Sequence, residues 1–347
     1  MKLKFVLLIS SIIFVAHQGA YAVAKDYLPG VTKEKVSAQI KAFSQKLADE
    51  HGFDSSTIES QLEKLEPRQD IIARITKPAE SMPWYRYRKI FIQDKRIDAG
   101  VGFWKKHQET LEKAEQQFGV DASIIVAIIG VETFFGKIQG DFPVIEALHT
   151  LGFYYPKRAK FFRSELEQYY LLAREQNWQL SNTKGSYAGA MGMGQFISSS
   201  YRHYGYDFNN DGKVNLFNDP VDMIGSVANY FNKHQWKKSQ FVAEKVVPSI
   251  DIKNLKQTEL KLQHDYSSIE KAGATLSELA SSSNRFGVFE FEKKAGEMDY
   301  WVVGDNFYSI TRYNRSPLYA LAVYQLSEAI ASKMQNQMLV SDTKTKG

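Results

Sequence analysis

One glutamate, Glu132, stands at the end of a stretch that is otherwise almost wholly apolar. From Ile124 to Val131 every residue except Gly130 is apolar. A carboxylate in that setting loses hydration, and at the last turn of a helix it also meets the negative end of the helix dipole. Both effects favour the neutral form, so we expect Glu132 to hold its proton towards neutral pH, as a general acid must. The alternative is a glutamate that simply reaches solvent at a helix end.

The residues around this acid predict how it is held. Gly119 ends the preceding segment, Asp121 can cap a new helix by accepting backbone N–H bonds, and Gly136 would stop that helix. About ten apolar residues are too few to span a bilayer and enough for a core helix. We therefore expect a short, buried helix with a single acid at its C-terminal end.

A glycine-rich run, GSYAGAMGMGQF at residues 185–196, holds a second unusual polar side chain. The glycines fit neither a dinucleotide-binding nor a P-loop pattern, and no strand is predicted before them. Small residues let backbones approach closely, so packing explains most of them. Gln195 is the exception, because its amide both donates and accepts hydrogen bonds within a small, apolar run.

The segment DFNNDGKVN at residues 207–215 has the spacing of the first half of an EF-hand calcium loop. Side-chain oxygens stand at positions 1, 3 and 5, glycine at position 6 and a backbone carbonyl at position 7, in Asp207, Asn209, Asp211, Gly212 and Lys213. Position 12, normally a bidentate glutamate, is Asn218, and acids follow only at Asp219 and Asp222. We expect a structural calcium ion here, closed by Asp219 or Asp222. The alternative is a turn rich in Asp and Asn.

The composition and the N-terminal residues indicate how large the folded protein is and where in the cell it acts. The chain has 347 residues, 44% of them hydrophobic, enough for a large core in two or three domains. Residues 1–22 are typical of a secretory signal, with Lys2 and Lys4, an apolar run of about 12 residues and a final Ala-Tyr-Ala. Without any cysteine, the chain lacks the residue that a lipoprotein signal modifies, and it has no disulfides or thiolate sites. We predict an exported protein with no permanent membrane anchor.

The net charge and the aromatic content indicate which classes of ligand the protein could bind. The formal net charge is +5, and about +3 once Lys2 and Lys4 leave with the signal. This small positive net charge differs from the strongly basic surface of a nucleic-acid-binding protein, so we predict no nucleic-acid partner. The chain also holds 5 Trp, 19 Tyr and 22 Phe, some of which could serve as stacking platforms for sugars.

Hydrophobic periodicity and turn residues divide the chain into segments. We predict an N-terminal helical domain at 23–118, a core at 119–240, a small β-rich insertion at 241–307, a returning helix at 308–335 and a disordered tail at 336–347. Within the insertion, the alternating stretches LKLQHDY, VFEFE and DYWVVGDNFYSI are expected to form short antiparallel strands around one helix at 276–280.

Five motifs occur together and in order, namely GVETFFGK, GSYAGAMGMGQF, DFNNDGKVN, DPVDMIGSVANYF and RYNRSPLYALAVYQL. Together they closely resemble the lytic murein transglycosylase B family, exported bacterial enzymes that cleave the glycan strands of peptidoglycan. The resemblance covers roughly residues 30–335. It implies a mainly α fold, with a lysozyme-like helical core, an additional helical domain and a small β insertion. It also implies a periplasmic location and, since no cysteine is present, a soluble, non-lipidated form.

The resemblance also implies roles for individual residues. Glu132 matches the sole catalytic acid of the family. The glycan cleft is matched by Ser186, Gln195, Phe196, Tyr230, Tyr313, Asn314 and Tyr319, and less closely by Tyr87 and Arg158. The calcium ligands are matched by Asp207, Asn209, Asp211, the carbonyl of Lys213 and Asp222, in a loop one residue longer before Asp219-Pro220. Calcium is the only cofactor implied, and no organic cofactor is expected.

The number of acids bears on the reaction. A glycosidase that works through water or a covalent intermediate normally needs two carboxylates flanking the bond. The sequence offers one well-placed acid, Glu132, with Asp141 as the nearest other candidate. The resemblance implies that Glu132 protonates the oxygen between MurNAc and GlcNAc, then takes the proton of the MurNAc C6 hydroxyl as a 1,6-anhydro ring closes. Two alternatives stay open: a muramidase that hydrolyses the same bond, and a non-catalytic peptidoglycan-binding protein stabilised by calcium.

Overall fold

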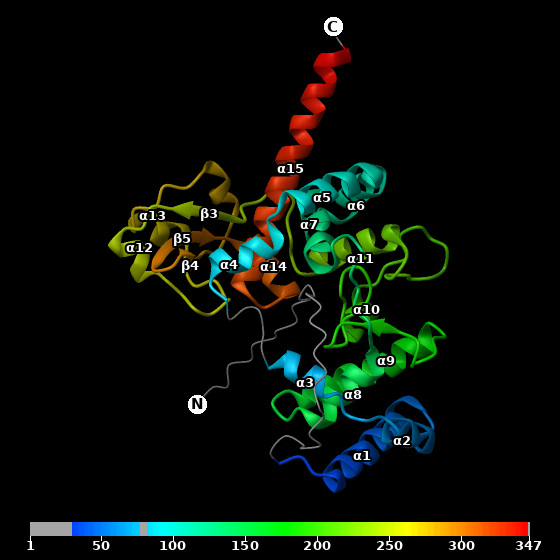
Figure 1. Ribbon diagram of the computed structural model, residues 1–347. Helices are drawn as coiled ribbons and strands as arrows, with labels where there is room; N and C mark the ends of the chain where they lie inside the picture. Colours follow the sequence, from blue (N-terminus) through cyan, green and yellow to red (C-terminus); the bar gives the residue numbers. More distant parts are fainter. Residues whose placement is uncertain (1–29, 77–81, 346–347) are drawn as a thin grey trace. The chain divides into compact units, whose positions relative to one another are not determined.

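The computed structural model describes residues 30–76 and 82–345, with side chains described up to residue 337. The predicted signal at residues 1–22 lies outside these ranges. The chain forms two compact units, each made of two chain segments. The first unit contains residues 82–138 and 206–345, and the second contains residues 30–76 and 139–205. Both are mostly helical, which confirms the predicted fold class (Figure 1).

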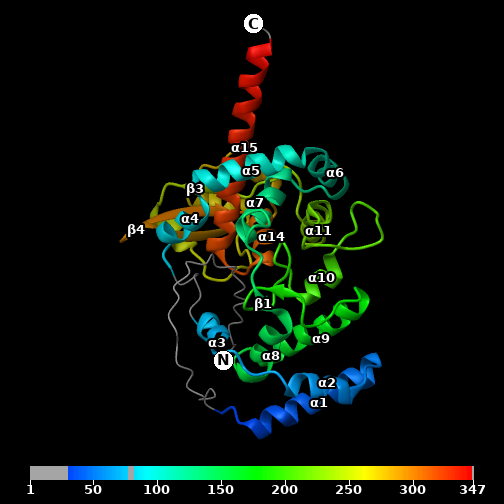
Figure 2. The ribbon, with the colours of Figure 1, turned by 45° about the vertical axis from the view of Figure 1, so that its right-hand side comes forward.

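The first unit is organised around two packed helices, α7 (Ala122–Thr133) and α15 (Pro317–Thr345). Helix α15 buries Val323, Leu326 and Ile330, whose spacing places them on one helical face. Figures 1 and 2 show α5, α7 and α14 beside it. The other large helices are α4 (Trp84–Phe91), α5 (Asp94–Lys106), α6 (Gln108–Phe118), α11 (Pro220–Lys233) and α14 (Asp305–Tyr313).

A small antiparallel sheet forms the predicted β insertion within this unit. Its strands are ordered β3 (Ala243–Val246), β5 (Glu297–Val303), β4 (Gly287–Lys294). Around it lie α12 (Ile250–Asn254), α13 (Tyr266–Lys271) and the 3₁₀ helix η2 (Glu278–Ser282). Phe286, Val288 and Val302 belong to its buried core. The sequence reading missed α12 and α13, although Ser249 and Asp265 cap them with side-chain hydrogen bonds.

Two of the predicted strands need correction. LKLQHDY forms no named strand and contributes an isolated bridge between His264 and Phe286. The stretch DYWVVGDNFYSI is a strand only to Val303, and its second half begins α14. Phe307 and Ile310 are both buried at helical spacing, which decides in favour of the helix.

The C-terminal segment also differs from its prediction. The single helix expected at 308–335 is two helices, because Pro317 cannot continue α14 but can begin α15. Helix α15 runs on to Thr345, through most of the tail predicted to be disordered.

The second unit packs α8 (Val144–Tyr154) against α9 (Ala159–Glu175), visible side by side in Figure 2. Its other elements are α1 (Lys33–His51), α2 (Ser55–Glu63), α3 (Gln69–Ile75), α10 (Ser198–Tyr204) and the short strands β1 (Phe142–Pro143) and β2 (Lys184–Gly185). Residues 30–76 belong to a different unit from residues 82–118, so the division into units falls within the segment predicted as one N-terminal domain. The predicted domain boundaries stay predictions.

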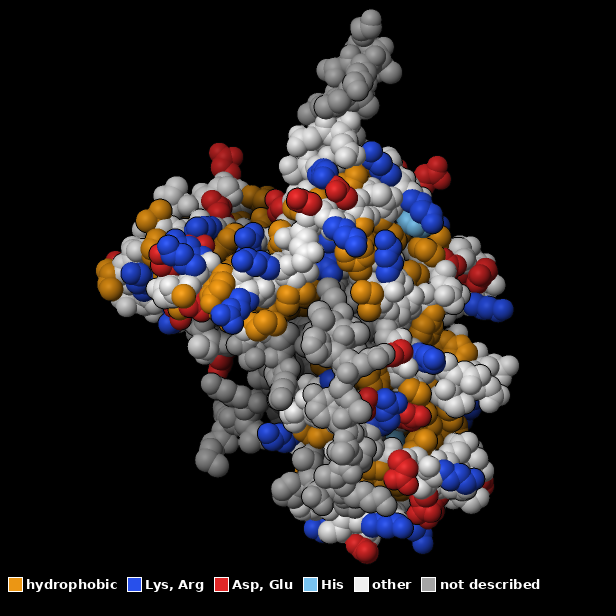
Figure 3. Space-filling model, viewed as in Figure 1, with side chains coloured by type: hydrophobic (Ala, Val, Ile, Leu, Met, Phe, Trp, Pro, Cys, Tyr) orange, Lys and Arg blue, Asp and Glu red, His pale blue; other side chains and the backbone are white. Residues whose placement is uncertain are grey.

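The surface is mixed in charge. On the face that Figure 3 displays, Lys and Arg side chains lie among acidic and apolar ones. Within the residues described, no single helix is both long and apolar enough to cross a membrane. Helices α6 and α7 meet that criterion only as a pair, and they are bent by 115°.

Candidate active site

Glu132 lies at the C-terminal end of α7, and its residue surface is 6% exposed. Every residue of α7 except Ser123 is buried, which confirms the predicted core helix. The predicted cap is wrong, since the Asp121 side chain makes no hydrogen bond to the first turn. Its carboxylate accepts instead from the indole N–H of Trp236 at 2.9 Å and the backbone N–H of Ser239 at 3.1 Å. Asp121 therefore ties the start of α7 to the loop after α11.

The chain turns sharply just after Glu132. Phe134, Phe135 and Gly136 all lie in the left-handed region, with φ of 53°, 60° and 82°. The sequence predicts Gly136 as the helix stop, whereas the helix ends at Thr133 and Phe134 is its left-handed cap. Left-handed backbone costs a non-glycine residue about 1–2 kcal/mol. Two adjacent phenylalanines in this conformation must therefore be held by their surroundings.

Two glycines make room for the ring that holds this turn. A Cβ atom on Gly130 would lie 2.7 Å from the Phe135 ring, and one on Gly100 of α5 would lie 3.2 Å from it. The ring thus folds back onto α7 beside the turn that carries Glu132. The lone glycine in the apolar run is accounted for by this close approach.

The Glu132 carboxylate accepts a hydrogen bond from the Tyr319 hydroxyl, with 2.6 Å between Oε1 and Oη. Tyr319 lies near the start of α15 and is 2% exposed. Burial, and next the charge of Glu132, raise the pKa of Tyr319 well above its usual value. The phenol therefore keeps its proton at physiological pH and remains a donor to the acid.

Other predicted cleft residues of the first unit gather around this pair. Burial, and then the charge of Glu132, raise the pKa of Tyr313, so the Tyr313 phenol lies near the acid. The rings of Tyr230 and Tyr313 meet edge to face with 4.8 Å between centroids. Tyr87, on α4, lies near enough to Tyr319 for its charge to affect the pKa of that phenol.

Exposure changes the role expected of these tyrosines. Tyr87 and Tyr319 are 1% and 2% exposed, so protein atoms cover their ring faces, and a sugar would not stack on them. Tyr313 keeps part of its surface exposed, and the buried Asn314 follows it as the C-cap of α14. Tyr319 therefore contributes through its hydroxyl rather than through its face.

His234 is a neighbour that the sequence reading missed. Its ring stacks on Tyr230 with 4.0 Å between centroids and 21° between planes. Burial lowers the pKa of His234, against the effect of its hydrogen bond with the Tyr230 carbonyl. The two residues are four apart at the end of α11, a spacing that brings side chains together and so offered a signal.

The second unit contains the remaining predicted cleft residues, Ser186, Gln195, Phe196 and Arg158. The Ser186 hydroxyl accepts from the backbone N–H of Ala190 at 3.1 Å. Gln195 has a left-handed backbone, with φ of 53°, and its Nε2 donates to the carbonyls of Gly192 and Gln139, each at 3.0 Å. These side chains therefore brace the glycine-rich loop from within.

Close backbone packing accounts for Gly185 in that loop and for the nearby Gly140. A Cβ on Gly185 would lie 2.2 Å from the Ala190 carbonyl oxygen, and one on Gly140 would lie 2.2 Å from that of Gly185. Phe196 forms an isolated bridge with Met191 and is 2% exposed. Its ring belongs to the interior of the unit.

Arg158 and Asp141 complete the predicted set. The Arg158 guanidinium lies over the rings of Phe161 and Phe162 at 4.4 and 4.9 Å from their centroids, and burial lowers its pKa. Asp141 is exposed.

The predicted calcium loop lies between α10 and α11 and folds on its own side chains. Asp207 accepts from the backbone N–H groups of Asp211 and Gly212 at 3.1 and 2.8 Å. Asn209 accepts from Asp211 at 2.9 Å, and Asp211 accepts from Lys213 at 2.9 Å. Gly212 has φ of +87°, which the glycine at position 6 permits. The oxygens at positions 1, 3 and 5 are thus wrapped into one turn and keep further lone pairs for a cation.

The two candidates for closing the loop have different surroundings. Asp222 is fully buried and joins the two ends of the loop, accepting from Phe208 N–H at 2.9 Å and Asn215 N–H at 2.8 Å. Asp219 caps α11 and accepts from the Asn209 amide at 2.8 Å. Both acids therefore contact the loop, and its oxygen-rich donor set fits calcium.

Another cluster in the described part of the chain could hold a metal. Ligand atoms of Glu50, His51 and Glu167 lie within 4.8 Å of one another. The Lys46 ammonium bonds to Glu167, and His51 Nε2 lies 2.9 Å from the other oxygen of that carboxylate. Because Lys46 already neutralises Glu167, we interpret this cluster as an ion-pair network.

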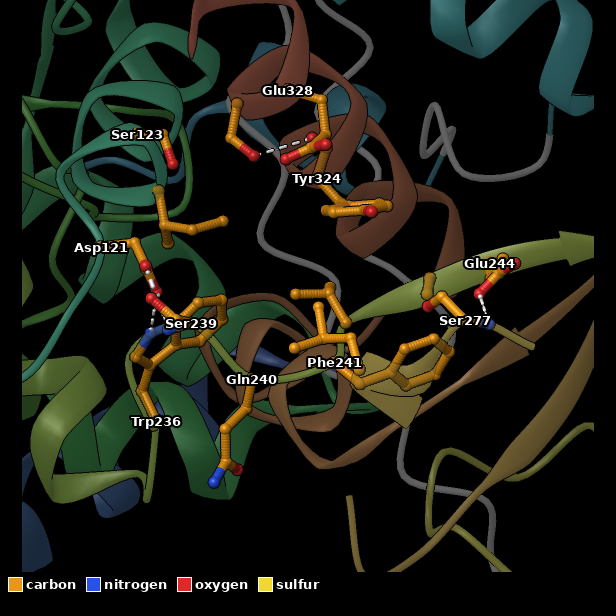
Figure 4. A pocket seen from close by; sticks show the side chains of 15 residues that line it. Asp121, Ser123, Trp236, Ser239, Gln240, Phe241, Glu244, Ser277, Tyr324 and Glu328 are labelled. Carbon is orange, nitrogen blue, oxygen red and sulfur yellow. Dashed lines mark hydrogen bonds between the residues drawn. The ribbon is translucent and has the colours of Figure 1, made fainter. Parts of the chain in front are cut away.

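A pocket of about 480 Å³ lies at the opposite end of α7 from Glu132 (Figure 4). Asp121 with Trp236 and Ser239 lines one side, and Tyr324 and Glu328 of α15 line another. The helix rise separates Asp121 from Glu132 by about 16 Å. None of the predicted glycan-binding residues lines this pocket, so its size does not make it the catalytic site.

Comparison with known proteins identifies the family. Residues 35–328 match the family described as "Transglycosylase SLT domain". Membrane-bound lytic murein transglycosylase B of Escherichia coli (strain K12) is 40% identical over 300 residues, covering 83% of this chain and 81% of that protein. The crystal structure of soluble lytic transglycosylase SltB1 from Pseudomonas aeruginosa is 42% identical with a TM-score of 0.78, covering 85% of this chain and 99% of that chain.

Two further structures carry bound molecules. Escherichia coli Slt35 in complex with calcium is 39% identical with a TM-score of 0.77, covering 85% of this chain and 93% of that chain. Pseudomonas aeruginosa SltB3 in complex with NAG-NAM-pentapeptide is 26% identical with a TM-score of 0.74, covering 86% of this chain and 80% of that chain. The helical, lysozyme-like fold is therefore shared over most of the chain. The chain belongs to the transglycosylase SLT family and, within it, to the lytic murein transglycosylases of type B, enzymes that cleave peptidoglycan.

Proposed function

We propose that this enzyme cleaves the bond between MurNAc and GlcNAc without water and leaves a 1,6-anhydroMurNAc end, with Glu132 as its single acid and base. The 2.6 Å hydrogen bond from the Tyr319 hydroxyl to the buried Glu132 carboxylate carries the proposal. It fixes the orientation of the carboxylate at the end of α7. A hydrolase would need a second carboxylate for its water or intermediate. Glu132 is buried near Tyr313, whereas Asp141, the nearest other acid candidate along the chain, is exposed.

The proposed reaction balances without a co-reactant. Glu132 gives its proton to the bridging oxygen, the bond from MurNAc C1 to that oxygen breaks, and GlcNAc leaves with a new hydroxyl. The MurNAc C6 oxygen then bonds to C1, and its proton passes to Glu132. The acid returns to its starting state, as general acid–base catalysis requires. An intramolecular nucleophile needs only correct orientation. We assign that orientation to Tyr230, Tyr313 and Asn314, which belong to the same unit as Glu132.

Product mass separates the proposed reaction from its alternatives. Purified sacculi digested by the enzyme should release fragments with anhydro ends, lighter by one water than the fragments of a muramidase. Reducing ends would instead identify a hydrolase. No release at all would identify a binding protein and contradict the proposal.

Replacing Tyr319 by Phe tests the oriented acid. The substitution removes one oxygen and leaves the buried ring, so the protein should still fold, with a melting temperature lowered by the loss of this hydrogen bond. A hydrogen bond to a charged group is worth about 1.5–3 kcal/mol. We therefore expect kcat/KM to fall by a factor of about ten or more.

Tyr324→Phe is the matched control for this variant. It makes the same change on the same helix, at a half-buried tyrosine that lines the pocket at the other end of α7. Equal activity of the Tyr319 and Tyr324 variants would show that the bond to Glu132 does not assist the reaction.

We further propose that a structural calcium ion binds the loop at Asp207, Asn209, Asp211, the Lys213 carbonyl and Asp222, with Asp219 as the other closing candidate. The wrapped loop geometry supports this, as does the calcium complex of the related Slt35. The ion would hold the start of α11, the helix that carries Tyr230.

Calcium should raise the melting temperature of metal-stripped protein. A ligand that binds only the folded state stabilises it by about 2.7 kcal/mol at one hundred times its Kd. The variant Asp211→Ala should lose this rise, while Asp251→Ala, at an exposed aspartate of α12, should keep it. A wild-type melting curve that calcium leaves unmoved would count against the site.

The relatives support proposals for the cellular location of the enzyme and for the form of its substrate. We propose that the mature enzyme acts in the periplasm after loss of residues 1–22, where peptidoglycan lies. The fragment bound to SltB3 bears a pentapeptide on its NAM sugar. We propose that this enzyme likewise acts on glycan strands whose MurNAc carries peptide stems.

A further inference from the structure

A pocket of about 300 Å³ in the first unit has a cationic lining. Its volume is at the low end of the range for small-molecule sites. Lys233, Lys237 and Arg312 contribute three positive charges, and Asp305 contributes one negative charge. Burial and the charge of Arg312 both lower the pKa of His234, which also lines the pocket, so its ring is neutral at pH 7. Two positive charges therefore remain in excess.

Among the residues that the structure describes, none forms an ion pair with these cations, Lys233, Lys237 and Arg312. The single acid of the pocket, Asp305, accepts from the backbone N–H of Asn284 at 2.7 Å and from its side-chain amide at 3.3 Å. By contrast, the neighbouring Lys238 pairs with Glu115 at 3.0 Å. An anion from outside the chain would therefore meet three available donors.

The pocket is joined to the candidate active site by direct contacts. The His234 ring stacks on Tyr230, and the Tyr230 hydroxyl donates to the backbone carbonyl of Arg312 at 2.6 Å. Tyr230 in turn meets Tyr313, whose phenol lies near Glu132. A polymer bound at Glu132 thus has the cationic pocket a few side chains away.

We propose that this pocket binds a carboxylate of the peptide stem borne by the glycan strand. The inference rests on the proposed function, in which peptide-bearing peptidoglycan binds at Glu132. A peptide stem branches from MurNAc, the sugar at the cleaved bond, and ends in a carboxylate. Ammonium and guanidinium groups are the usual partners of carboxylates, and Arg312 offers the paired donors that suit one. Because the three cations are largely exposed, the attraction should be modest and should weaken with salt.

Two matched substrates test the proposal. One is glycan strands with peptide stems, and the other is the same strands after enzymatic removal of the stems. The wild type should show a higher kcat/KM on the peptide-bearing form, mainly through KM. In the variant Lys233→Gln, Lys237→Gln, Arg312→Gln the ratio of the two values should fall about 5- to 10-fold, given the small worth of each exposed pair. Amidated stems should lower the wild-type ratio in the same way.

The control removes three charges elsewhere in the same unit. Lys253, Lys261 and Lys271 are exposed residues in and around α12 and α13, and their joint change to Gln should leave the ratio at its wild-type value. The inference is overturned if the wild type treats both substrates alike, or if the pocket variant keeps the full preference. Failure of the wild type to cleave either substrate would instead contradict the proposed function, so the two failures are distinguishable.

Discussion

The Glu132→Gln variant is expected to fold like the wild type, to bind glycan strands and to lose nearly all cleavage. Gln has the size of Glu, and its carbonyl oxygen can still accept the bond from the Tyr319 hydroxyl. Replacing an ionisable group by a neutral one at a site that is 6% exposed should leave the free energy of unfolding the same or slightly higher. The amide cannot donate a proton to the glycosidic oxygen or take one from the C6 hydroxyl. Positioned acid–base catalysis is worth about 10²–10⁴-fold per role, and in the proposed mechanism one side chain serves both roles.

Asp141→Asn is the control for that variant. Asp141 is exposed and is the nearest other acid along the chain, so its neutralisation should cost little activity. The measurements are release of soluble fragments from sacculi, cosedimentation with sacculi and a melting curve for each variant. A folded Asp141→Asn enzyme as inactive as Glu132→Gln would favour a two-carboxylate hydrolase and end the single-acid proposal.

Acidification should destabilise the protein through His149, a fully buried residue of α8. Burial lowers the pKa of His149 to about 4, and neither ring nitrogen has a hydrogen-bond partner among the described residues. The unfolded chain has the ordinary pKa of about 6.5, so between pH 6.5 and 4 it binds a proton that the folded protein does not. Stability is therefore full above pH 6.5 and falls as the pH drops towards 4. The loss from this one residue is about 3 kcal/mol.

The His149→Leu variant isolates that contribution from the carboxylates that titrate in the same range. Its ring neighbours are Phe153 and Tyr154, each with 5.5 Å between centroids, so an apolar side chain suits the site. Denaturant unfolding at several pH values should give a flatter curve for the variant, by about 3 kcal/mol between pH 6.5 and 4. The corresponding change at the exposed His203 should leave the slope almost unaltered. Parallel curves for wild type and His149→Leu would refute the assignment.

Local sequence patterns predicted which helices and strands this protein forms more reliably than they predicted where those elements begin and end. The apolar run before Glu132 has no polar face, so it had to be a core helix, and α7 is one. The predicted N-terminal cap and the predicted C-terminal stop of this helix were wrong. The Asp121 carboxylate accepts a hydrogen bond from Trp236 instead of capping the helix, and Phe134 rather than Gly136 is the left-handed residue that ends it. Both errors have one cause: hydrogen bonds and packing from distant segments outweighed local capping preference. The same competition turned the second half of DYWVVGDNFYSI into α14.

The sequence by itself singled out Glu132 as the candidate acid, identified the family and showed the calcium-type spacing, because motifs are local and their order is visible along the chain. Tertiary structure alone decided what each tyrosine does. Residue spacing cannot show that the Tyr319 hydroxyl donates a hydrogen bond to Glu132, which lies 187 residues away in the chain. Nor can it show that the faces of the Tyr319 ring are buried. Nor can it show three cations meeting in one pocket, since Lys233 ends α11, Lys237 follows that helix and Arg312 comes from α14. Such contacts depend on how helices pack, and packing is set by the summed burial of many side chains rather than by any one motif.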